Sequence, residues 1–107
     1  MAKKAKKVIK AKEEAQKFLA DVPEEYVFWC HDGKVIRNMR ELAEALTDMT
    51  DETFGYHSNI DKRDFSCWVR DVIGDEKLAK DLEDAPNRTM AAGHVATRIT
   101  SLSKELA

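Results

Sequence analysis

The stretch Tyr26-Val-Phe-Trp-Cys-His-Asp-Gly-Lys-Val-Ile-Arg37 decides the fold expected for this chain. Aromatic and β-branched residues dominate residues 26–31, which is typical of a β-strand. Asp32-Gly33 favours a two-residue type I′ hairpin turn, because both positions of that turn need positive φ. Residues 34–37 then form the returning strand. Since an isolated hairpin is marginally stable in water, one of its faces must pack against helices.

Helical patterns lie on both sides of the predicted hairpin. Residues 3–20 combine Ala, Lys, Glu and Gln without Gly or Pro, which favours a helix that stops before Pro23. After the hairpin, Asn38 and Glu41 form a capping-box-like pair at the start of an amphipathic helix. Its apolar stripe has helical spacing and consists of Met39, Leu42, Ala43, Leu46 and Met49.

Shorter helical segments follow. Residues 51–57 form a short turn or helix, and Asp61 is expected to cap the next helix, which Gly74 ends in the left-handed conformation. The apolar face of that helix holds Phe65, Trp68, Val69, Val72 and Ile73. Asp75 caps a short helix, and the last helix covers about residues 88–106, with a stripe of Ala91, Val95, Ile99, Leu102 and Leu106.

These elements predict an α+β fold: a helix-rich single domain in which one β-hairpin is packed by four or five helices. The 107 residues suit one domain, and the 43% of hydrophobic residues suffice for one modest core. Residues 1–20 form a lysine-rich N-terminal arm and helix. Residues 21–107 form a compact helical domain that contains the hairpin at residues 26–37.

A composite pattern in the middle of the chain resembles a known family. It reads His…Asp-Phe-x-x-Trp-Val…Gly-Asp-x-x-Leu-Ala, preceded by the hairpin 28–36 and by Asn38-Met-Arg-Glu-Leu42. This resembles a small domain of unknown function that recurs in archaeal and bacterial proteins, over roughly residues 26–84. The resemblance implies a fold and a cytoplasmic setting, and no catalytic roles. The pattern residues are His57, Asn59, Asp64, Phe65, Trp68, Val69, Gly74, Asp75, Leu78 and Ala79.

Charge is distributed unevenly along the chain, although the total is only −2. Residues 1–17 hold seven lysines against two glutamates, a net +5, whereas the 11 basic and 18 acidic residues that follow give −7. The cationic arm can neutralise nucleic-acid phosphates without reading sequence, pack on an acidic partner, or act as a solubility tail. The candidate nucleic-acid-binding residues are Lys3, Lys4, Lys6, Lys7, Lys10 and Lys12.

The two faces of the predicted hairpin are both apolar. Strand alternation places Tyr26, Phe28 and Cys30 on one face, and Val27, Trp29 and His31 on the other. Either helices cover both faces, or one face is a docking surface for a partner. We take Val27, Trp29 and His31 as the candidate docking residues. Trp68 lies on a helical stripe with Phe65 and is interpreted as a core residue.

The sequence offers no pattern for catalysis, a cofactor or a metal. Glycines occur singly, there is no nucleophile elbow, and the candidate ligands lack metal-site spacing. His57 is interpreted as forming a hydrogen bond to an acidic N-cap and thereby fixing the loop before the helix that carries Phe65 and Trp68. Cys30 and Cys67 are expected to be reduced thiols and small buried hydrophobes.

The same observations define the expected function. The protein is predicted to be a non-enzymatic interaction module that binds a protein partner, and the alternative is a small nucleic-acid-associated protein that uses its lysine arm. No apolar segment follows the basic N-terminus, and the longest apolar run is residues 26–30. We therefore expect no secretory signal, no membrane span and a cytoplasmic location.

Overall fold

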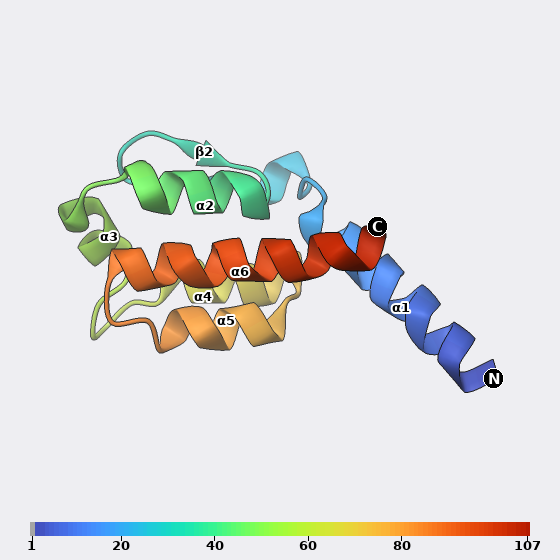
Figure 1. The fold of residues 1–107 in the computed structure, drawn as a ribbon. Coiled ribbons are helices and arrows are strands. Elements are labelled where there is room, and N and C mark those ends of the chain that lie inside the picture. The colour runs from blue at the N-terminus through green and yellow to red at the C-terminus, as the bar shows by residue number, and fades with distance from the viewer. Residues whose placement is uncertain (1) are drawn as a thin grey trace.

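The hairpin forms an outer layer on a helical body in the computed structural model, which describes the backbone of residues 2–107 and the side chains from Lys10 onward (Figure 1). In chain order the elements are α1 (Ala2–Leu19), the 3-10 turn η1 (Glu24–Tyr26), β1 (Phe28–Trp29), β2 (Val35–Ile36), α2 (Met39–Asp48), α3 (Asp51–His57), α4 (Asp64–Trp68), the π-helical turn η2 (Val69–Ile73), α5 (Glu76–Glu83) and α6 (Arg88–Leu106).

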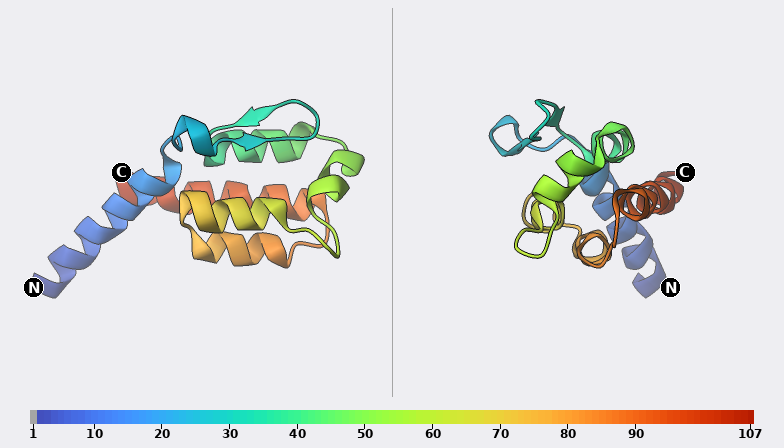
Figure 2. Two further views of the ribbon diagram at one scale, coloured as in Figure 1. Left: turned by 180° about the vertical axis from the view of Figure 1, so that it is seen from behind. Right: turned by 90° about the vertical axis from the view of Figure 1, so that its left-hand side faces the viewer.

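The core lies between the hairpin with α2 on one side and α4 with α5 on the other, and α6 runs along it (Figure 2). The predicted α+β, helix-rich single domain is confirmed. In α1, the buried side chains Ala15, Phe18 and Leu19 pack the C-terminal half of the helix on the body. The largest fully buried apolar side chains are Ile36, Met39, Leu42, Leu46, Val69, Leu78 and Val95.

The strands are shorter than the sequence predicts. β1 holds only Phe28 and Trp29, because residues 24–26 form a 3-10 turn in which the Tyr26 amide donates to the Pro23 carbonyl. β1 pairs antiparallel with β2, and Trp29 lies opposite Val35. The prediction of a strand over residues 26–31 is therefore too long at both ends.

The predicted type I′ turn is wrong. Gly33 has a φ of 92°, but no non-glycine residue of the described chain has positive φ, so Asp32 does not meet that turn's requirement. The turn is instead closed by the Gly33 amide donating to the Cys30 carbonyl, and Cys30 also donates to the Lys34 carbonyl. The loop thus spans three residues, with glycine at its left-handed position.

Helix ends follow local side-chain chemistry in most places. The Asn38 side chain accepts a hydrogen bond from the Glu41 amide at 2.8 Å, and the Glu41 side chain accepts one from the Arg37 amide. In a standard capping box the glutamate would instead accept from the amide of the N-cap residue, Asn38. Gly74, with a φ of 94°, ends the segment as predicted. Asp61 does not cap α4, since Arg63 occupies that position without a side-chain cap bond. The helix begins two residues later than the prediction of an Asp61 cap requires.

Candidate interaction surface

The outer face of the hairpin carries an exposed indole. Phe28 and Cys30 turn inward, whereas the Trp29 side chain between them is 72% exposed. Cross-strand pairing places Val35 beside Trp29 on the same outer face. Val27 is half-buried and contributes less surface. The question that the sequence left open is answered: one hairpin face packs on helices and the other faces solvent.

A second exposed aromatic feature lies at the hairpin turn. The exposed His31 ring lies on the Tyr56 ring from α3, with centroids 3.9 Å apart and planes 15° from parallel. Lys62 Nζ lies 4.0 Å from the centroid of the Tyr56 ring, which is a cation–π geometry. We call Trp29, Val35, His31 and Tyr56 together the docking surface.

The buried His57 side chain holds the hairpin turn from the side that faces the body. Its ring is buried, its Nε2 accepts a hydrogen bond from the His31 amide at 2.9 Å, and its Nδ1 lies 3.0 Å from Asp64 Oδ2. Because Nε2 must accept, the proton of the neutral ring is on Nδ1 and is donated to Asp64. The predicted hydrogen bond from His57 to an acidic residue before Phe65 is thus confirmed, but that residue, Asp64, is the first residue of α4 and not its N-cap.

Aromatic side chains anchor β1 to the body below this surface. Phe28 stacks on Phe65 with centroids 5.1 Å apart and meets Trp68 edge-on at 5.9 Å. Trp68 is buried, as predicted, and its indole Nε1 donates to the Tyr26 carbonyl at 2.8 Å. The strand that carries Trp29 is therefore held by packing and by hydrogen bonds on its inner side.

Charged groups flank the hairpin. Arg37, about half exposed, lies 3.7 Å from Glu41 through Nη1. In the turn, the Lys34 amide donates to Asp32 Oδ1 at 3.0 Å, and this hydrogen bond lowers the pKa of the Asp32 carboxyl below its usual value. The Asp32 carboxylate therefore stays ionised to lower pH than a free aspartate, and its hydrogen bond stabilises the loop conformation next to His31.

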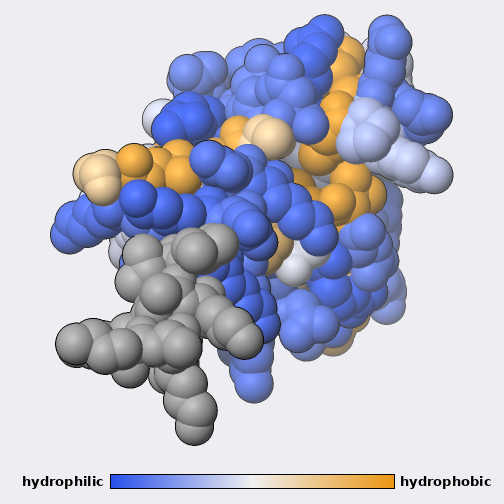
Figure 3. Space-filling view, turned by 90° about the vertical axis from the view of Figure 1, so that its right-hand side faces the viewer, coloured by the Kyte–Doolittle hydropathy of each residue, from blue (hydrophilic) through white to orange (hydrophobic). Residues whose placement is uncertain are grey.

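The lysines predicted to bind nucleic acid lie on α1. Lys10 and Lys12 are exposed, and the side chains of Lys3, Lys4, Lys6 and Lys7 lie outside the described ones. The first turns of α1 extend past the end of the body where both termini lie (Figure 1). That end of the molecule is mostly hydrophilic, with hydrophobic residues showing in small groups (Figure 3).

The structure also shows the burial of the two cysteines and the arrangement of the potential metal ligands. Cys30 is buried and burial raises the pKa of its thiol, whereas Cys67 is exposed, so the prediction of two buried cysteines is wrong for Cys67. Cys67 falls on the solvent side of α4 because its neighbours Ser66 and Trp68 occupy the inner side. Both cysteines are free thiols. Among the described residues, no three His, Cys, Asp or Glu side chains converge as a metal site would require.

Comparisons of the chain with protein-family models, with curated proteins and with solved structures returned no match. The resemblance of residues 26–84 to a small archaeal and bacterial domain therefore stays a prediction. Within residues 2–107, no helix is both long enough and apolar enough to cross a bilayer.

Sequence reasoning missed half of the docking surface. The sequence patterns place Val35 only in the returning strand and Tyr56 only in a short helix. Cross-strand pairing with Trp29 could have indicated Val35, once the turn length was known. No local sequence pattern could have predicted the contact between Tyr56 and His31, because the two residues are 25 positions apart and meet only where α3 packs against the turn.

Proposed function

We propose that this protein is a non-enzymatic interaction module that binds a protein partner through the docking surface. The observation that carries the proposal is the 72% exposure of the Trp29 side chain on the outer hairpin face. Tryptophan, tyrosine and arginine dominate binding energy at protein interfaces. Trp29 and Tyr56 belong to this surface, and Arg37 directly follows β2, the strand that carries Val35.

The surface is held rigid from below, which favours binding. Trp29 sits between the inward-facing Phe28 and Cys30, and His57 holds the His31 amide in place. A preorganised surface loses little conformational entropy when a partner docks. The partner that fits offers an apolar cleft for the indole, with a hydrogen-bond acceptor for its N–H at the rim.

Site-specific photocrosslinking tests the proposal. A photoreactive amino acid at position 29 should crosslink one partner in cells of the native host, and the same group at Met90, an exposed position on α6, should not. The captured protein is then purified and its affinity measured directly. Trp29→Ala should weaken binding by about 2 kcal/mol or more, roughly 30-fold, and Met90→Ala should leave it unchanged. Equal crosslinking at both positions, or an unchanged affinity for Trp29→Ala, would refute the proposal.

The alternative function is non-specific nucleic-acid binding by the lysines of α1. It is supported by the projection of the first turns of this helix from the body (Figure 2) and by the exposure of Lys10 and Lys12. Binding of labelled duplex DNA should then fall steeply with salt, with a log–log slope of about 0.9 per phosphate contact. Replacing the six lysines with glutamine should abolish it. No binding at low salt would exclude this function.

A further inference from the structure

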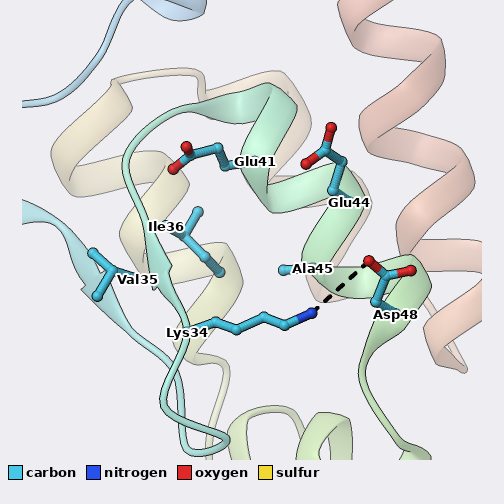
Figure 4. Close-up of a pocket in the computed structure, with 7 residues that line it drawn as sticks. All are labelled: Lys34, Val35, Ile36, Glu41, Glu44, Ala45 and Asp48. Carbon is cyan, nitrogen blue, oxygen red and sulfur yellow. Dashed lines mark ion pairs between the residues drawn. The ribbon is translucent and has the colours of Figure 1, made fainter.

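A groove of about 280 Å³ lies between β2 and α2 (Figure 4). Its apolar lining consists of Val35, Ile36 and Ala45. Carboxylates from α2 stand along its other wall, and Lys34 reaches across it from the hairpin. This groove is separate from the docking surface proposed above, except that both include Val35.

Two of the carboxylates are available to a ligand. Glu41 is already occupied, since its Oε1 accepts from the Arg37 amide at 2.8 Å. Glu44 is exposed, and Asp48 meets Lys34 at 3.8 Å with both side chains at least half exposed, which is a weak ion pair. Glu44 and Asp48 are one helical turn apart, with a rise of about 6 Å between them. Together with the apolar lining, they suit a cationic segment that also carries aliphatic side chains.

The first turns of α1 have this chemistry. Lys3 and Lys7, and likewise Lys6 and Lys10, are four residues apart on one helix, the same spacing as the two carboxylates. Val8 and Ile9 lie between Lys7 and Lys10 in sequence and supply aliphatic groups. The net +5 of residues 1–17 and the net −7 of the rest of the chain favour contact between this segment and the body.

The contact cannot form within one molecule. α1 is one continuous helix from Ala2 to Leu19, and its N-terminal turns lead away from the body (Figure 1). Asp48 ends α2, just before α3, which lies at the opposite end of the body from the first turns of α1 (Figure 1 and the left view of Figure 2). Reaching the groove of its own molecule would require breaking α1.

We propose that the lysine-bearing first turns of α1 dock in the β2–α2 groove of a second copy of this chain. Arm and groove are different surfaces, so the contact is heterologous. The pairs are solvent-exposed and weak, so the association is concentration-dependent and is screened by salt.

Sedimentation velocity on the full chain tests this proposal. At about 50 mM salt the weight-average sedimentation coefficient should rise with protein concentration, and at about 500 mM salt it should stay at the monomer value. Glu44→Gln with Asp48→Asn should give a monomer at low salt, as should glutamine at Lys3, Lys6, Lys7 and Lys10. The control variant Glu25→Gln with Glu105→Gln removes two exposed carboxylates outside the groove and should associate like the wild type.

Charge reversal separates this contact from a general charge effect. A groove variant, Glu44→Lys with Asp48→Lys, and an arm variant with glutamate at Lys3, Lys6, Lys7 and Lys10 should each fail to associate alone. A chain that carries both reversals should associate again at low salt, because its reversed arm fits the reversed groove of a second copy, although its net charge is more negative than that of the wild type. The proposal is overturned if the wild type stays monomeric at low salt, if groove variants associate normally, or if the doubly reversed chain stays monomeric. Because Trp29 is untouched in all these variants, failure here leaves the proposed partner binding standing.

Discussion

Arg98 on α6 forms a two-point ion pair with Asp75, the N-cap residue of α5. Its Nε lies 2.7 Å from Oδ2 and its Nη2 lies 3.2 Å from Oδ1. Asp75 is 1% exposed and also accepts from the Leu78 amide at 3.2 Å. One carboxylate therefore starts α5 and ties it to α6, and its charge is neutralised by a residue 23 positions later in the sequence.

Replacing Arg98 and replacing Asp75 should lower the free energy of unfolding by different amounts. Arg98→Met leaves a buried, unpaired carboxylate and should cost about 3–5 kcal/mol of unfolding free energy. Asp75→Asn keeps an acceptor for the Leu78 amide and leaves Arg98, whose side chain is 19% exposed, able to reach water. It should cost about half as much. Urea denaturation of the two variants measures the difference, and equal losses would contradict a special cost of leaving the Asp75 carboxylate unpaired.

His57 should control the hairpin turn through one hydrogen bond. His57→Phe keeps an aromatic ring of similar size but leaves the His31 amide without its acceptor, which should cost about 1–3 kcal/mol. Amide hydrogen exchange followed by NMR should show slow exchange at His31 in the wild type and fast exchange in the variant. Slow exchange in both would mean that another group protects this amide.

Trp68 should stabilise the core in two separable ways. Trp68→Ala removes a large buried side chain and should cost about 3–5 kcal/mol, measured by the urea midpoint. Trp68→Phe keeps most of the packing against Phe28, and loses the hydrogen bond to the Tyr26 carbonyl together with part of the indole volume. Its cost should be about 1–2 kcal/mol. A phenylalanine variant as unstable as the alanine variant would contradict this division.

The two thiols should react differently in the folded protein. Cys67 is exposed and should be alkylated quickly at neutral pH, whereas Cys30 is buried with a raised pKa and should react only on opening of the structure. Intact-mass analysis over time should show one label first and the second later. Under denaturing, non-reducing conditions both cysteines should be labelled, and a protected pair there would reveal a disulfide.

The first turns of α1 should be dispensable for folding. Among the described side chains, burial on this helix begins at Ala15, with Ala11 half-buried before it. Deleting residues 2–7 should therefore leave the thermal midpoint nearly unchanged, as measured by calorimetry at a salt concentration that keeps the chain monomeric. A drop of many degrees would show that these turns pack on the body.

Much of the helical fold could be predicted from the sequence, because its signals are local. Apolar stripes at helical spacing predict α2 and α6, and the last helix has the predicted bounds, Arg88–Leu106. Asn38 and Asp75 cap their helices, and Gly74 ends the preceding segment, as their residue types indicate. Such preferences arise within one or two turns of chain, so the residues themselves determine them.

The remaining features of the hairpin and of its surface depend on tertiary packing. The length of the hairpin loop, the exposure of Trp29 rather than Phe28, and the stacking of His31 on Tyr56 depend on which helix faces the turn. Both faces of the predicted hairpin are apolar, so the alternation of side chains along the strand does not show which face is buried. Packing against Phe65 and Trp68 selected the face that carries Phe28, because these aromatic rings need a buried partner. Trp29, on the opposite side of the same strand, was left in solvent.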